Sequence, residues 1–122
     1  MHVATVGTTP LRRAPVPGGP TAEVLIAPGI SDQVAVIHME IPAGGRLPEH
    51  AHGASQVVLI PLSGSVDLHH GDDQHTLLLG SAAHLDTGER IGLANRGPVP
   101  ASLMVVVSPP DFAAHLAAWP AL

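Results

Sequence analysis

The chain has 122 residues, which fits one domain, and 45% of them are hydrophobic, enough to build a core. It has no cysteine, tyrosine or lysine, which excludes disulfides, a thiol nucleophile and a Schiff-base lysine. Its net charge of −5 and its single Phe and single Trp argue against a nucleic-acid partner. Because nine histidines remain, acid–base or metal chemistry is expected to use His, Asp and Glu.

The first twenty residues show no hydrophobic periodicity and end in a stretch rich in Pro and Gly, which predicts an extended N-terminal arm over residues 1–20. No apolar stretch approaches the roughly 20 residues that a membrane-spanning helix needs. Arg12 and Arg13 are not followed by the apolar segment of a signal peptide. We therefore expect a cytoplasmic protein with no membrane partner.

Short apolar runs typical of β-strands then alternate with turn sequences over residues 21–109. The expected strands are Ala22–Ala27, Gln33–Ile41, Gln56–Leu62, Ser65–His69, His75–Leu79, Ala82–Leu85, Ile91–Ala94 and Ser102–Ser108. The chain contains 13 Gly and 13 Pro, which supply the turns between them. Strands at this spacing predict an all-β fold, an antiparallel β-barrel or jelly roll.

The last residues, 110–122, change to a helical pattern. Ser108 can cap such a helix, and the prolines that follow it suit the first helical position. Phe112, Leu116 and Trp119 are spaced to share one helical face. A helix this short needs a surface to pack on, so we expect it to dock on the barrel or on a dimer partner.

Two histidines separated by one residue, His50 and His52, are the first candidate site. In an extended segment these side chains point to the same side and can converge on one ion. Metal-free acid–base catalysis is a further interpretation, with either histidine paired with Glu49 or Asp86. The catalytic candidates are therefore His50, His52 and Glu49, although Glu49 is expected to face away from its neighbour.

The segment around the two histidines resembles the first motif of the cupins, G-x5-H-x-H-x3/4-E-x6-G, and a later segment is similar to their second motif, G-x5-P-x-G-x2-H-x3-N. The matching residues are Gly44, His50, His52 and Gly64 in the first motif and Gly80, Gly88 and Asn95 in the second. The resemblance runs from about Val34 to Val107. It implies a cupin double-stranded β-helix.

The resemblance also implies a metal held by three His and one Glu, but two of these positions differ here. The Glu position holds Gln56 or, with the longer allowed spacing, Val57, and the third His is replaced by Ile91. The candidate metal ligands are then His50, His52 and Gln56. Neutral ligands offset no charge, so we expect weak binding of a divalent metal, with Zn, Ni or Cu favoured over Fe or Mn.

Two functions remain open. The first is a metal-dependent enzyme of the dioxygenase, isomerase, cyclase or lyase type, acting on a small metabolite through His50 and His52 with Gln56. The alternative is a metal-free binding or sensor protein, because the segment from Gln56 to Gly64 is similar to the cupin-type sensor domains of AraC-like regulators. Both functions imply a small-molecule ligand.

Apolar residues are expected to line the pocket of the barrel for either function. The candidates for contact with the ligand are Val58, Ile60, Ala83, Leu85 and Ile91. Because cupins commonly pair, the resemblance also implies a homodimer, to which the N-terminal arm and the C-terminal helix are suited.

The homodimer can be tested directly. At micromolar concentration, static light scattering is expected to give the mass of two chains. The mass of one chain would contradict the expectation.

Overall fold

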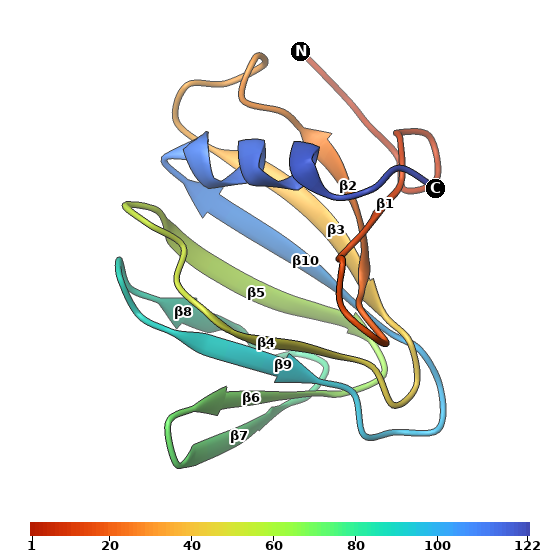
Figure 1. The fold of residues 1–122 in the computed structure, drawn as a ribbon. Helices are drawn as coiled ribbons and strands as arrows, with labels where there is room; N and C mark the ends of the chain where they lie inside the picture. The colour runs from red at the N-terminus through yellow and green to blue at the C-terminus, as the bar shows by residue number, and fades with distance from the viewer.

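The computed structural model describes residues 1–122 and contains ten strands and one short helix (Figure 1). The strands are β1 (Arg12–Arg13), β2 (Thr21–Ile26), β3 (Ala35–Ile41), β4 (Arg46–His50), β5 (Gln56–Ser63), β6 (Val66–His70), β7 (Asp73–Leu77), β8 (Ala83–Leu85), β9 (Ile91–Ala94) and β10 (Ala101–Ser108). The helix is η1 (Pro110–Ala118).

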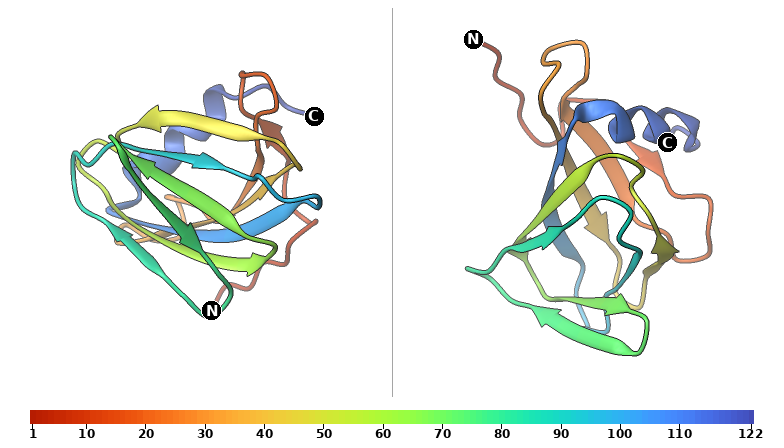
Figure 2. Two further views of the ribbon diagram at one scale, coloured as in Figure 1. Left: turned by 90° about the horizontal axis from the view of Figure 1, so that it is seen from below. Right: turned by 90° about the vertical axis from the view of Figure 1, so that its left-hand side faces the viewer.

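The strands form two sheets in which all neighbours are antiparallel. The larger sheet has the order β1-β2-β3-β10-β5-β8, and the smaller one has the order β4-β9-β6-β7. Figure 2 shows the two sheets as opposing layers that diverge on the side covered by η1. The expected all-β antiparallel jelly roll with a short C-terminal helix is therefore confirmed.

The core lies between the sheets and follows the two-residue period of the strands. Along β10, Leu103, Val105 and Val107 are buried while the residues between them are partly exposed. Ile37 on β3 and Leu93 on β9 face the same core. Each fully buried side chain of this size contributes about 1.5–3 kcal/mol, so this alternation determines which residues face inward.

Two strands were not expected from the sequence, namely β1 and β4. β4 contains Pro48 and Glu49 and is mostly exposed or half-buried, so it lacks the apolar alternation that marks a strand. It nevertheless pairs with β9 and carries His50 at its end.

The C-terminal helix begins differently from the prediction. Pro109 is its N-cap and forms no side-chain capping bond, so the expected cap by Ser108 is wrong. The hydroxyl of Ser108 instead donates to the carbonyl of Gln33 at 2.7 Å. The segment is a 3-10 helix packed on β10 and β3, and it is too short to cross a bilayer.

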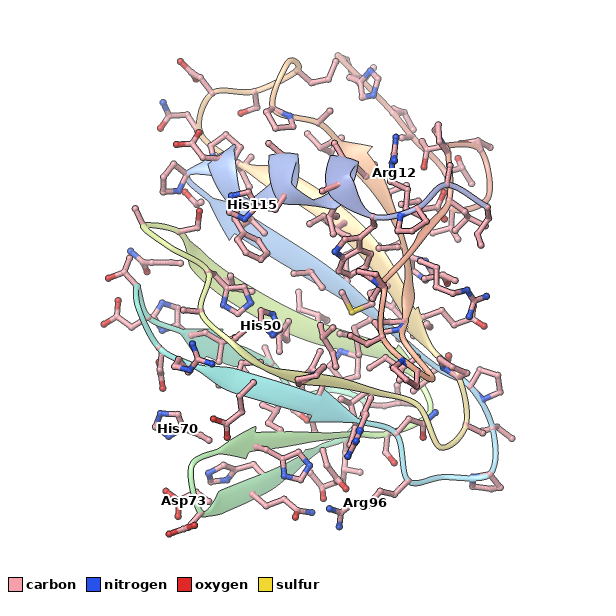
Figure 3. The ribbon with its side chains drawn as sticks, viewed as in Figure 1. Arg12, His50, His70, Asp73, Arg96 and His115 are labelled. Atoms are coloured by element: carbon pink, nitrogen blue, oxygen red, sulfur yellow. The ribbon has the colours of Figure 1, made fainter.

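The N-terminal arm packs along its own chain. Arg12 pairs with Ala22 of β2, and its guanidinium donates to the carbonyls of Ala117 and Trp119 at 3.1 and 2.8 Å. The arm around Arg12 and the last residues of the chain therefore meet beside η1 (Figure 3). The homodimer stays a prediction.

A buried carboxylate, Glu23, holds the beginning of the arm against the larger sheet. It accepts hydrogen bonds from the Gly7 amide at 3.0 Å and the Thr9 hydroxyl at 2.6 Å, and His38 lies 3.7 Å away. Burial raises the pKa of Glu23, but the hydrogen bonds from Thr9 and Gly7 and the nearby His38 outweigh it, so the pKa falls below its usual 4.5.

Replacing this carboxylate should release the arm. We expect Glu23→Gln to lower the free energy of unfolding by about 1–3 kcal/mol at neutral pH, since buried donors lose a charged acceptor. Because the pKa of Glu23 is lowered by folding, this difference should shrink as the pH falls below 4.5. Urea unfolding and amide exchange at Gly7 and Thr9 measure the effect. Glu40→Gln, on an exposed position of β3, is the control; equal effects of the two changes would contradict the prediction.

Candidate functional site

A cavity of about 400 Å³ lies between the sheets, and 13 of its 19 lining residues are hydrophobic. The barrel contributes residues of β3, β4, β5, β9 and β10, such as Met39, Leu59 and Val105. The arm contributes 14–16, and η1 with the residue after it contributes four side chains. A cavity of this volume with a mostly apolar lining is typical of a site that binds a small organic molecule.

His50 and His52 lie side by side in the wall of this cavity. Their ring centroids are 4.6 Å apart and the rings meet edge to face at 65°. His52 is buried, with 6% of its surface exposed, whereas His50 is half-buried. The structure thus brings together the two histidines of the first motif.

An irregularity of β4 orients His50. The pairing of β4 with β9 shifts between Leu47 and His50, which leaves Pro48 and Glu49 out of the ladder. The freed Pro48 carbonyl accepts a hydrogen bond from His50 Nδ1 at 2.8 Å, and the Glu49 carbonyl accepts one from Arg90 at 3.1 Å. A carbonyl only accepts, so Nδ1 of His50 carries the proton. In the neutral ring, Nε2 is then a free acceptor.

His52 is held in its neutral form. Its Nδ1 is buried without a hydrogen-bond partner. Burial lowers the pKa of His52 from 6.5 to about 4, and the nearby His50 makes a smaller contribution in the same direction. At neutral pH this imidazole is therefore an uncharged polar group inside an apolar wall.

Phe112 of η1 covers the two histidines. Its ring lies 4.7 Å from that of His52 and stacks over that of His50 at 6.4 Å and 15°. His115 also lies against Phe112, with the ring centroids 5.1 Å apart, and lines the cavity. Figure 3 shows His115 on η1 and His50 at the end of β4, on the same side of the molecule. The chain's only Phe and only Trp, Phe112 and Trp119, both line the cavity.

Gln56 is not placed with the two histidines. It begins β5 with its side chain on the outer face, where its Oε1 and His84 Nε2 are 2.8 Å apart. The next residue, Val57, is fully buried and faces inward. Side chains of a strand alternate, so the inward position that a Glu would occupy holds Val57. This corrects the expected position of Gln56.

The same alternation decides which expected ligand contacts are present. Ile91 lines the cavity and pairs directly with His50 across the two strands. Val58 and Ile60 share the outward side of β5 with Gln56, so they do not reach the cavity. Ala83 and Leu85 pack in the core but not in the cavity wall.

Glu49 does not direct its charge at the histidines. Its carboxylate accepts a hydrogen bond from the Gly71 amide at 3.1 Å, in the hairpin between β6 and β7. That hairpin, labelled by His70 and Asp73 in Figure 3, lies away from η1. Glu49 therefore supports the irregular part of β4 and is not placed as a base.

The residues present do not fit the metal that cupins commonly hold. No three His, Cys, Asp or Glu side chains are placed to share an ion. Beside His50 and His52, the two further ligand positions hold Val57 and Ile91, which have no donor atoms. Two histidine side chains with no further donor beside them are a poor site for a divalent cation.

Several site residues were missed in the sequence. Arg90 and Pro48 position His50 through main-chain contacts, and the arm residues 14–16 close one side of the cavity. A Pro within a short strand is a signal of an irregular edge and could have indicated the bulge. Nothing in the sequence near residues 14–16 indicated that the arm would contact the cavity.

Comparison with known proteins is consistent with this geometry. Residues 37–107 match the family model described as Cupin domain. The match spans more than half of the chain, so the protein belongs to the cupin family. No curated protein matches the sequence.

Solved structures share the fold at low identity. The polyketide cyclase RemF from Streptomyces resistomycificus has a TM-score of 0.77 at 20% identity, over 88% of this chain and 79% of its own. A predicted oxalate decarboxylase from Thermotoga maritima has a TM-score of 0.77 at 19% identity, over 88% and 98%. KdgF from Halomonas sp. has a TM-score of 0.73 at 12% identity, over 88% and 94%. These similarities establish the fold alone.

The buried imidazole predicts a pH dependence of stability. Because folding lowers the pKa of His52 from 6.5 to about 4, the unfolded chain binds the proton more readily, and stability falls as the pH falls through this window. Between pH 7 and 4 the wild type should lose about 1–3 kcal/mol more than His52→Leu. Urea unfolding at each pH measures this loss. His75→Leu, at an exposed hairpin position, should keep the wild-type dependence; parallel curves for wild type and His52→Leu would contradict the assignment.

Proposed function

We propose that this cupin binds a small, uncharged and largely apolar molecule that carries a hydroxyl group, without a resident metal. The observation that carries the proposal is the free Nε2 of His50 in the wall of an apolar cavity of about 400 Å³. In the neutral ring this atom only accepts a hydrogen bond, so it selects a ligand with an O–H donor.

The charge of the cavity supports an uncharged ligand. Glu49 is the only Asp, Glu, Lys or Arg in the lining, and its carboxylate is engaged by Gly71. His52 is neutral at physiological pH because burial lowers its pKa to about 4. A charged ligand would lose its hydration and meet no counter-ion, which is strongly unfavourable.

The family supports a small-molecule site without selecting the chemistry. The structural neighbours are named as a polyketide cyclase and as a predicted oxalate decarboxylase, two different activities on one fold. A shared fold hosts unrelated reactions, so the ligand is argued from this chain's own cavity.

Displacement of a fluorescent dye tests the ligand class. We expect the uncharged N-phenyl-1-naphthylamine to bind, and 4-propylphenol to displace it at a several-fold lower concentration than propylbenzene. One hydrogen bond is worth about 0.5–1.5 kcal/mol, which corresponds to a ratio of roughly 2- to 12-fold. His50→Ala should abolish this preference and the exposed His75→Ala should retain it. No dye binding, or equal displacement by both compounds, would overturn the proposal.

Elemental analysis of tag-free protein tests the metal-free part. We expect less than stoichiometric metal in the wild type, and no gain after incubation with Zn, Ni, Mn and Fe salts. About one metal per chain that is lost in a His50→Ala/His52→Ala double variant would instead establish a site on the two histidines.

A further inference from the structure

We infer that His50 is a general base that removes a proton from an activated carbon of the bound molecule, so that the cavity catalyses proton transfer without a metal. The substrate class is an uncharged carbon acid, whose C–H is acidified by an adjacent carbonyl or an equivalent electron-withdrawing group. This inference rests on the proposed function, because the substrate must first enter the apolar cavity. Its activated C–H then takes the position beside His50 Nε2 that the hydroxyl group of a bound, unreactive ligand occupies.

The base is oriented before the substrate binds. The 2.8 Å bond from Nδ1 to the Pro48 carbonyl selects the tautomer in which Nε2 is unprotonated. The same carbonyl stabilises the ring after Nε2 accepts a proton, because the Nδ1–H of an imidazolium is a stronger donor. Arg90 holds the neighbouring Glu49 carbonyl at 3.1 Å and thereby fixes the irregular backbone. Arg90 is thus a positioning residue, since it contacts the backbone and lies outside the cavity lining.

Side chains of the cavity wall surround the ring of His50. The ring of Phe112 lies nearly parallel to that of His50, with the centroids 6.4 Å apart, and His50 itself is half-buried at the edge of the cavity. The ring of His52 lies beside that of His50, with the two centroids 4.6 Å apart, and is buried in the cavity wall.

The step balances without any co-reactant. The C–H bond breaks, its electron pair remains on the substrate as an enolate or equivalent anion, and the proton binds His50 Nε2. Return of that proton to the same carbon gives exchange, and return to a neighbouring carbon of a conjugated system gives an isomer. Either return restores the neutral imidazole, and no oxidant, reductant or metal takes part.

A probe reaction that needs only a base tests the inference. In 5-nitrobenzisoxazole, an uncharged bicyclic aromatic, removal of the C–H proton forms a nitrile as the N–O bond breaks and releases a coloured phenolate. We expect saturable elimination by the wild type, with kcat/KM at least about tenfold above that of His50→Gln, since a positioned base contributes roughly 10²–10⁴-fold. The exposed His75→Gln should match the wild type.

Further measurements distinguish loss of the base from loss of folding or of binding. Circular dichroism and thermal unfolding establish that His50→Gln is folded, and added imidazole should restore elimination in His50→Ala by occupying the vacated space. Displacement of N-phenyl-1-naphthylamine by the probe reports binding separately. If the probe binds but the wild type eliminates it no faster than His50→Gln does, His50 is not a general base, and the proposed function stands. Failure of both the dye and the probe to bind would overturn both.

Discussion

A main-chain carbonyl that leaves its ladder must find another donor, and the site of this protein depends on how the Pro48 carbonyl does so. The irregularity of β4 frees this carbonyl, and His50 Nδ1 donates to it at 2.8 Å. One hydrogen bond therefore satisfies the backbone, selects the tautomer of His50 and leaves its Nε2 to the cavity. The chemistry of the site is a consequence of how a short, poorly apolar strand pairs with β9.

The strands in which apolar and polar residues alternate could be predicted from the sequence. The apolar runs of β3, β5, β9 and β10 were recognised because burial on one face imposes a two-residue period. β4 was missed because Pro48 and Glu49 interrupt any such period. The first motif also allowed either Gln56 or Val57 at the inward position, and only the pairing of β5 with β10 and β8 decides between them. A difference of one residue reverses every side chain of a strand, which is why Val58 and Ile60 were misplaced with it.

The cavity and the buried imidazole both reduce the stability that the core provides. The side chains that line the cavity have fewer packed neighbours than those of the core and lose dispersion contacts, and Nδ1 of His52 is buried without a partner among the side chains and the backbone. The long pairing of β10 with both β3 and β5 offsets these losses in the larger sheet. A ligand that fills the cavity would recover part of them, since any molecule that binds only the folded state stabilises it.

The roof of the cavity comes from the two ends of the chain. Residues 14–16 and the side chains Phe112 to Trp119 line it, and Arg12 joins the ends by donating to the Ala117 and Trp119 carbonyls. The family match spans residues 37–107 and so contains neither end. The roof and the strands that carry His50 and Ile91 therefore come from different parts of the chain. A substitution of a roof side chain such as Phe112 or Trp119 would alter the shape of the pocket while the strands that carry His50 and Ile91 stay the same, so the shape of the pocket and its histidine pair can be changed independently in this chain.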